Sequence, residues 1–230
     1  MVSGSERIRD AAQDFDVAVA DTKEKLEAAF RLRHQVYCVE RGFEPGNGAL
    51  ETDRFDARSM HAILTQRSTG RVVGTVRVVG PSLQEPDADL PMQRLCPSDV
   101  FRMLPMGSTG EISRFSISKD LRDAACAGNA MLRLGLMRGI VQVSDAMNLT
   151  HWCAIMEHTL LRLLRVSAIH FQPLGPAIEH RGLRQPSWGS IDTVLGRMRR
   201  ERPAVWDYIT DGGALWQGHE EAEAAEAAFA

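Results

Sequence analysis

Three segments that lie far apart in the chain contain the residue types best suited to chemistry. They place charged groups in otherwise apolar surroundings: Glu51, Asp53 and Asp56 around Phe55; Arg77 between valines; and Glu111, Ser113 and Arg114 before Phe115. Buried charge is costly unless it is paired, and an arginine can hold a carboxylate through two parallel hydrogen bonds. We therefore expect one shared buried network, which serves either as a structural brace or as a site.

The composition is that of a globular protein and excludes several classes. The chain has 230 residues, 44% of them hydrophobic and 25% charged, and its formal net charge of −3 gives no basic signature of a nucleic-acid partner. No apolar run reaches the ~20 residues that a membrane span needs. Residues 1–16 lack the apolar core of a signal peptide, so a cytoplasmic location is expected.

The cysteines and histidines show no metal-ligand spacing and no disulfide framework. The four cysteines, none in a C-x-x-C pair and all expected to be free thiols, are Cys38, Cys96, Cys126 and Cys153. The histidines expected in the core or at the surface are His151, His158, His170 and His180. No bound metal is therefore expected.

Hydrophobic periodicity and turn residues predict an α/β (α+β) fold. The predicted strands are residues 16–20, 61–65, 71–79, 111–118, 150–155 and 169–174. The predicted helices are one capped by Asp21 or Thr22, a short one near 97–104, and those over 129–144, 156–166, 191–201 and 203–210. Three successive strands favour a mixed, mostly antiparallel central sheet with helices on both faces. Residues 1–15 are expected to form a flexible arm, 16–216 the domain, and 217–230 a disordered or frayed tail.

These residues, in this order, resemble the acyl-homoserine-lactone synthase branch of the GCN5-related N-acetyltransferases. The matching positions are Arg33 and Tyr37, Phe43, then Glu51, Asp53, Phe55 and Asp56, then Arg77, and last Glu111, Ser113, Arg114 and Phe115. Segments 150–157, 182–186 and 200–207 resemble acyltransferases of the PEP-CTERM/exosortase system, which are grouped with N-acyl amino acid synthases. The resemblance spans about residues 16–216 and implies a GNAT-like fold and an N-acyltransferase.

Two departures from that branch affect the expected substrates. Phe43 stands where lactone synthases usually have tryptophan, and the loop 40–50 is not their S-adenosylmethionine-enclosing segment. This favours an amino acid or similar small amine as acyl acceptor. The segment 119–129 has one glycine and is not a clean pyrophosphate loop, which favours acyl carrier protein over acyl-CoA as donor. No tightly bound cofactor is expected.

Acyl transfer to an amine needs a base, and Glu111 is the first candidate, followed by Glu51. Backbone N–H groups around 115–118 are expected to stabilise the oxyanion, where that strand splays from 150–155. Arg33, Arg77 or Arg114 is expected to bind an acceptor carboxylate. On a regular strand Glu111 and Arg114 point to opposite faces. Further candidates for the catalytic or substrate-binding set are Ser113, Tyr37, Phe43, Asp53, Asp56, Phe115 and Trp152.

Two further groups of residues have both a functional and a plain structural interpretation. Leucines and an isoleucine are expected to line an acyl tunnel or to be simple core: Leu132, Leu136, Ile155, Leu160 and Leu164. Arginines are expected to dock an acidic acyl carrier protein or to be a solvated helix face: Arg162, Arg165, Arg197, Arg199, Arg200 and Arg202. The competing functions are an S-adenosylmethionine-dependent lactone synthase and a non-catalytic acyl-binding module.

Overall fold

The structure, a computed structural model, describes residues 8, 10, 12–46, 48–82, 89–122 and 126–216, without the side chains of 126–129. Most of the expected N-terminal arm (1–15) and all of the expected tail (217–230) lie outside the described residues. Cys126 lies outside them too, as far as its side chain is concerned. The other three cysteines are free thiols.

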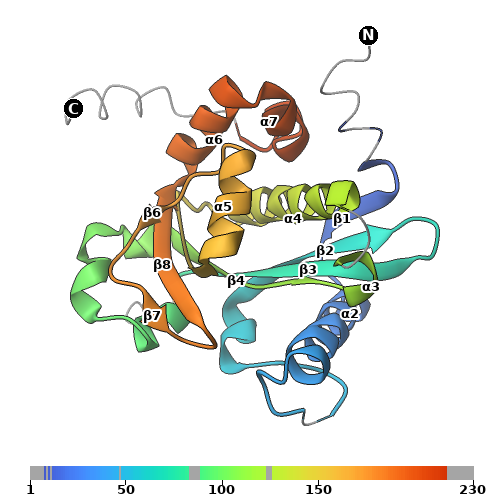
Figure 1. Cartoon of the computed structure of the whole chain (residues 1–230), viewed down its shortest axis with the longest axis horizontal. Coiled ribbons are helices and arrows are strands. Elements are labelled where there is room, and N and C mark those ends of the chain that lie inside the picture. Colours follow the sequence, from blue (N-terminus) through green and yellow to red (C-terminus); the bar gives the residue numbers. More distant parts are fainter. Residues whose placement is uncertain are drawn as a thin grey trace.

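One mixed sheet of eight strands forms the centre of the described part (Figure 1). The strands are β1 (Phe15–Val19), β2 (Ser59–Gln66), β3 (Arg71–Val79), β4 (Thr109–Ile117), β5 (His151–Glu157), β6 (Gln172–Pro173), β7 (Ile178–Glu179) and β8 (Leu183–Ser190). Their order is β1-β2-β3-β4-β5-β8-β6, with β7 also paired to β8. Only β4 and β5 pair in parallel among these strands, so the expected mixed, mostly antiparallel sheet is confirmed.

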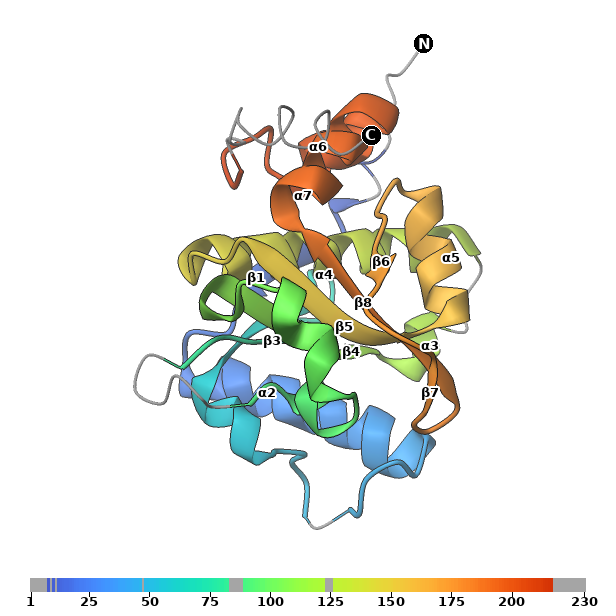
Figure 2. The same ribbon diagram turned by 90° about the vertical axis from the view of Figure 1, so that its left-hand side faces the viewer.

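Helices cover both faces of the sheet, as predicted. The α-helices are α2 (Lys23–Arg33), α3 (Lys119–Arg122), α4 (Cys126–Ala146), α5 (His158–Val166), α6 (Ile191–Glu201) and α7 (Pro203–Ile209). A π-helix (His34–Glu40) continues α2, and short 3-10 helices occupy Arg54–Arg58, Pro91–Arg94, Ser98–Met103 and Met106–Ser108. Figures 1 and 2 show α2 on one side of strands β1–β3 and α4 on the other.

The main core lies between α4 and the sheet. Two glycines of α4 bring the helix close to β2, because a Cβ at Gly139 would lie 2.5 Å from the Cβ of Ala62, and one at Gly135 would lie 2.8 Å from Leu64 Cδ1. Leu132 and Leu136 belong to this core.

Strands β4 and β5 separate soon after they meet. They pair only over Thr109–Glu111 and His151–Cys153, and beyond this point no β4–β5 pairing continues. On its other edge β4 follows β3, but with a bulge: Ser113 pairs with Arg77, and the next partners are Ser116 and Thr75. One extra residue therefore sits in β4, and Arg114 takes a left-handed backbone with φ 52°.

Two strands of the sheet, the short β7 and the longer β8, were not predicted. Strand β8 pairs with β5 over Arg184–Ser190, although it contains Pro186 and Gly189. Proline and glycine disfavour sheet interiors, but the carbonyl of Pro186 still accepts a hydrogen bond from Leu174 N at 2.9 Å. The predicted strand 169–174 is correspondingly wrong in extent, because only Gln172–Pro173 pairs with β8.

Candidate active site

Arg33 ends α2 and is fully buried beneath the sheet. Thr22, one of the two predicted caps, begins the helix by accepting a hydrogen bond from Lys25 N. The Arg33 Nε donates to Glu51 at 2.5 Å, and its Nη1 donates to Asp56 Oδ1 at 2.7 Å. A guanidinium removed from water is stable only with such partners, so Arg33 ties α2 to the acidic segment.

The acidic segment is shaped by its own carboxylates. Asp53 Oδ1 accepts from Phe55 N at 2.8 Å, and Asp56 Oδ2 accepts from Asp53 N at 2.7 Å, which forms a capping box on a single 3-10 turn. Burial opposes ionisation of Asp56, but the hydrogen bond and charge of Arg33 outweigh it and lower the pKa of Asp56 to about 2. Asp56 is thus ionised and structural at neutral pH.

The two strand arginines complete the network from the sheet side. Arg77 Nη1 donates to Asp53 at 2.6 Å and to Asp56 at 2.9 Å, while its Nε donates to Ser113 Oγ at 3.0 Å. Arg114 Nη2 donates to Glu51 at 2.9 Å and to Asp53 at 3.1 Å. The predicted shared network therefore exists, and its arginines are already engaged by carboxylates of the chain itself.

The bulge in β4 overturns the expectation that Glu111 and Arg114 point to opposite faces. Both residues line the same cavity. The left-handed backbone of Arg114 adds one residue to β4 between Ser113 and Ser116, which shifts the alternation of side chains. The alternation of a regular strand does not include this extra residue.

A cavity of about 530 Å³ occupies the gap where β4 and β5 separate. Its apolar part includes Met137 and Ile140 of α4, Leu160 and Leu164 of α5, and Phe171. Its polar part includes Glu111 and seven arginines, which come from widely separated segments of the chain. An elongated apolar group and a polar reacting group can therefore be held in one continuous space.

The predicted site residues divide into three sets. Those that line the cavity are Tyr37, Phe43, Arg77, Glu111, Ser113, Arg114 and Phe115, together with the tunnel candidates Ile155, Leu160 and Leu164. Those that lie behind it, in the charged network, are Arg33, Glu51, Asp53 and Asp56. Those placed in the main core instead are Trp152, Leu132 and Leu136. Trp152 Nε1 donates to Ser144 Oγ at 2.8 Å, which satisfies its polar atom without a substrate.

Glu111 differs from Glu51, Asp53 and Asp56 because no arginine of the described residues pairs with it. It is 4% exposed, and its Oε2 accepts a hydrogen bond from Met92 N at 2.8 Å. Burial raises the pKa of Glu111 to about 8, although the Met92 N–H and the charge of Arg77 act in the opposite direction. Glu51 has a lowered pKa, since hydrogen bonds from Arg114 and Arg33 outweigh its burial. Of the two candidate bases, only Glu111 has the proton affinity that suits the task.

The raised pKa of Glu111 predicts a pH-dependent cost to folding. The native state holds this proton up to about pH 8, whereas an unperturbed glutamate releases it near 4.5, so the stability contributed by this group falls as pH rises through that window. Glu111→Gln removes the ionisable group and keeps an acceptor for Met92 N. Its melting temperature should match the native protein's near pH 5 and exceed it by pH 8.5. Circular dichroism measures both melting temperatures. If the difference between them does not change from pH 5 to pH 8.5, the pKa of Glu111 is not raised.

A second group of basic residues lines the cavity and was not among the predicted site residues. These residues, which come from the end of the π-helix, from α3 and α4, and from the β7–β8 turn and β8, are Arg41, Arg122, Arg133, His180, Arg181 and Arg184. Those on β8 gave no signal because the strand itself was not predicted. Arg133 had a usable signal, since it shares a helical face with Met137 and Ile140, at spacings of four and seven residues.

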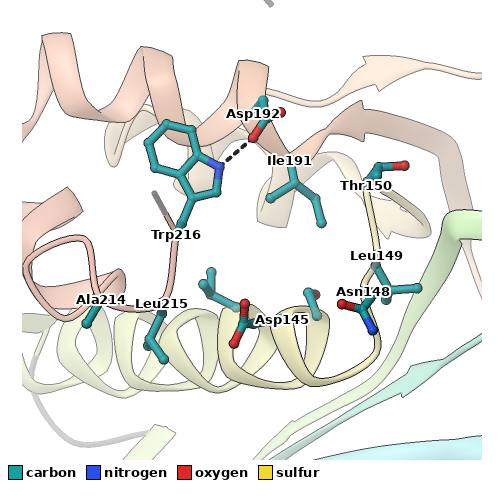
Figure 3. A pocket seen from close by; sticks show the side chains of 11 residues that line it. Asp145, Asn148, Leu149, Thr150, Ile191, Asp192, Ala214, Leu215 and Trp216 are labelled. Atoms are coloured by element: carbon teal, nitrogen blue, oxygen red, sulfur yellow. Dashed lines mark hydrogen bonds between the residues drawn. The ribbon is translucent and has the colours of Figure 1, made fainter. Parts of the chain in front are cut away.

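A second cavity, of about 360 Å³, lies between the end of α4 and the start of α6 (Figure 3). Trp216 closes one side of it and donates a hydrogen bond from Nε1 to Asp192 at 2.5 Å. Neither Glu111 nor the charged network reaches this space. No group of three histidine, cysteine, aspartate or glutamate side chains in the described ranges could hold a metal ion. No helix among the described residues is long and apolar enough to cross a membrane.

Comparison with known proteins agrees with this fold. Residues 32–131 match a family model described as an acetyltransferase (GNAT) domain. No curated protein matches the sequence.

Three solved structures illustrate the similarity of fold. TofI, in a ternary complex with an inhibitor and MTA, is 16% identical with a TM-score of 0.62, over 83% of this chain and 99% of that chain. BjaI, a CoA-dependent acyl-homoserine lactone synthase with SAM and isopentyl-CoA, is 23% identical with a TM-score of 0.55, over 86% and 87%. FeeM, an N-acyl amino acid synthase from uncultured soil microbes, is 12% identical with a TM-score of 0.59, over 80% and 93%. The chain thus has a GNAT-like fold, and the GNAT-domain match supports an acyltransferase.

Proposed function

We propose that this protein is an N-acyltransferase that moves a fatty acyl group from a thioester donor to the amine of an amino acid or similar small molecule. The observation that carries the proposal is the cavity in the β4–β5 gap, which joins an apolar compartment to the unpaired, buried carboxyl group of Glu111. The GNAT-domain match over residues 32–131 supports the same class of chemistry.

In the proposed reaction Glu111 takes a proton from the acceptor's ammonium group, directly or through one water molecule. The neutral nitrogen attacks the thioester carbonyl carbon, the C–N bond forms and the carbonyl oxygen becomes an oxyanion. The C–S bond then breaks, the nitrogen gives up its second proton so that the amide forms, and the departing thiolate takes up that proton. Backbone N–H groups of β4 are the proposed oxyanion donors. The N–H of Ser118 is not one of them, since it donates to Val73 O at 2.8 Å. The proposed donors are therefore in the segment from the bulge at Arg114 to the end of β4.

The apolar part of the cavity is the proposed acyl site, and Met137 is a residue that sets its depth. Met137 is 2% exposed and lines the cavity from α4. Met137→Trp should lower turnover of long-chain donors at least ~10-fold relative to short-chain donors, at a stability cost of about 1–3 kcal/mol from overpacking. The measurement is kcat/KM across a series of acyl lengths. An equal loss at every length would show that Met137 does not contact the acyl chain.

Acyl carrier protein is the proposed donor, with acyl-CoA as the alternative. Helix α5 lies beside the cavity and exposes Arg162, Leu163, Arg165 and Val166. Burial, Arg197 of α6 and Arg165 of α5 all lower the pKa of His170, so basic residues of both helices lie near it, with Glu201 as a counter-charge. A basic surface with exposed apolar side chains suits an acidic protein partner. Membership of a PEP-CTERM/exosortase system, in the cytoplasm, remains part of the proposal and rests on the resemblance of segments 150–157, 182–186 and 200–207.

The test incubates the purified protein with long-chain acyl carrier protein or acyl-CoA and each of the twenty amino acids, followed by mass spectrometry. The expected result is an N-acyl amino acid that forms with the wild-type protein and not with Glu111→Gln. Reactions with S-adenosylmethionine run in parallel, and an acyl-homoserine lactone product would replace this proposal with the lactone-synthase function. A bound lipid without any product would indicate the non-catalytic acyl-binding module.

A further inference from the structure

The cavity carries more positive charge than the chain neutralises. Seven arginines line it, against two glutamates, of which Glu111 holds its proton up to about pH 8. Arg77 and Arg114 are engaged by the buried network behind the cavity, and Arg122 and Arg181 pair with Glu40 and Glu44. The surplus therefore lies elsewhere on the wall, and it predicts that the bound substrate is anionic in that part.

Part of this surplus is found at the β5–β8 edge of the gap. Arg184 of β8 pairs in register with Glu157 of β5, and its Nη2 donates to Glu157 Oε1 at 2.9 Å. Arg41 approaches the same oxygen at 3.9 Å, so two arginines share one carboxylate. The Arg184 Nε–H is shielded from solvent and has no hydrogen-bond partner in the described structure. A guanidinium often binds a carboxylate through two parallel hydrogen bonds. Here Glu157 accepts only the bond from Nη2, so the second donor, Nε, is left for another acceptor.

Arg184 lies level with the β4 bulge across the gap. Glu111 pairs with Cys153, and Glu157, the partner of Arg184, lies four residues further along β5. The bulge at Arg114 lies three residues beyond Glu111 on β4, and parallel strands advance at the same rise per residue. One carboxyl group reaches both sides of the gap. Glu44 Oε1 accepts from Arg114 Nη2 of β4 at 3.2 Å and from Arg181 Nη2 of the β7–β8 turn at 2.6 Å.

The aromatic side chains at this end do not favour a cationic acceptor. Arg41 and Arg181 each lie over the ring of Phe43, at 5.6 Å and 5.5 Å from its centroid. Arg114 lies 5.2 Å from the centroid of Tyr37. The ring faces that would attract a cationic ligand are therefore occupied by the chain's own guanidinium groups.

We propose that Arg184 binds the carboxylate of the acyl acceptor, so that the acceptor is an amine with a carboxylate a few bonds from its nitrogen. This inference rests on the proposed acyl transfer and adds the residue that selects the substrate. The incoming carboxylate replaces the single contact of Glu157 and engages both Nε and Nη2 of Arg184. Its amine then faces the β4 bulge, where the thioester is held.

The test crosses a substrate change with a residue change. The preferred amino acid and the amine that results from its decarboxylation are compared as acceptors for the wild-type protein and Arg184→Gln. Arg184→Gln should lower kcat/KM for the amino acid by about 10- to 100-fold, through KM, the range expected for a hydrogen-bonded charge. The decarboxylated amine should react equally with both proteins, and KM for the acyl donor should stay unchanged.

The matched control is Arg67→Gln, since Arg67 forms an exposed ion pair with Asp16 away from the cavity. Equal losses for both acceptors, or no loss for the amino acid, would overturn the role of Arg184. Calorimetric binding of the same two compounds separates this inference from the proposed function. If no amine is acylated, the function fails, while tighter binding of the amino acid than of the amine, lost in Arg184→Gln, would still support the carboxylate site; equal binding would refute it.

Discussion

Replacing Glu111 with glutamine is expected to lower kcat for acyl transfer by about 10²- to 10⁴-fold, the usual contribution of a general base. Glutamine keeps the size of the side chain and can still accept the hydrogen bond from Met92 N, which in the native protein is 2.8 Å long. The fold and the cavity should therefore survive, and only the proton acceptor is removed. Single-turnover assays with a preformed acyl donor measure this loss directly.

The pH dependence of the acyl-transfer rate tests the role of Glu111 independently. The base works only when ionised, and burial raises the pKa of Glu111 to about 8. The wild-type rate should therefore rise with pH through about 8 and then level, while the residual rate of Glu111→Gln should follow only the ionisation of the free amine. Glu51→Gln is the informative comparison, since Glu51 is the other candidate base. A larger loss from Glu51→Gln, in a folded protein, would move the role of base to that residue.

Arg33→Ala is expected to cause the largest loss of stability, about 3–5 kcal/mol of the free energy of unfolding. The substitution leaves Glu51 and Asp56 buried without the guanidinium that now donates to both. Urea unfolding followed by tryptophan fluorescence measures the change. Arg33→Lys keeps the charge without the planar fork and should lose less. Arg67→Ala, which removes an exposed pair, should cost no more than about 1 kcal/mol.

Acid titration shows whether the loss comes from the carboxylates. The pKa of Asp56 is about 2 in the folded protein against an ordinary 3.8, so its ionisation stabilises the fold above pH 3.8, and this contribution disappears as pH falls toward 2. The difference between wild type and Arg33→Ala should therefore be largest near neutral pH and should narrow below pH 4. A difference that is constant with pH would mean that lost packing, not lost pairing, destabilises the variant.

The charged network was predictable from residue types alone, although its members lie far apart in the chain. Charged residues in apolar segments must find partners, and the three arginines and their carboxylates do so at 2.5–3.2 Å. Helix boundaries followed local signals: Ser190 and Thr22 cap their helices, and Pro203 begins α7. These boundaries depend on short-range preferences that act whatever the rest of the chain does.

The parts that escaped prediction depend on tertiary context. Strand β8 has a proline in its interior and polar residues along its length, so only pairing with β5 makes it a strand. The bulge at Arg114 is held by contacts with Glu44, Glu51 and Asp53, which come from distant segments. The placement of Arg184 at the cavity follows from the first of these two features, and the shared facing of Glu111 and Arg114 follows from the second.

The π-helix after α2 makes the spacing of residues there more important than their identity. Arg41 N donates to Val36 O at 3.2 Å, five residues back, so this turn holds one residue more than an α-helical turn. Arg33 before it faces the buried network, while Tyr37 and Arg41 within and after it face the cavity. Inserting or deleting one residue would turn everything downstream by about 100°. In this stretch a change of length should therefore be far more damaging than most substitutions.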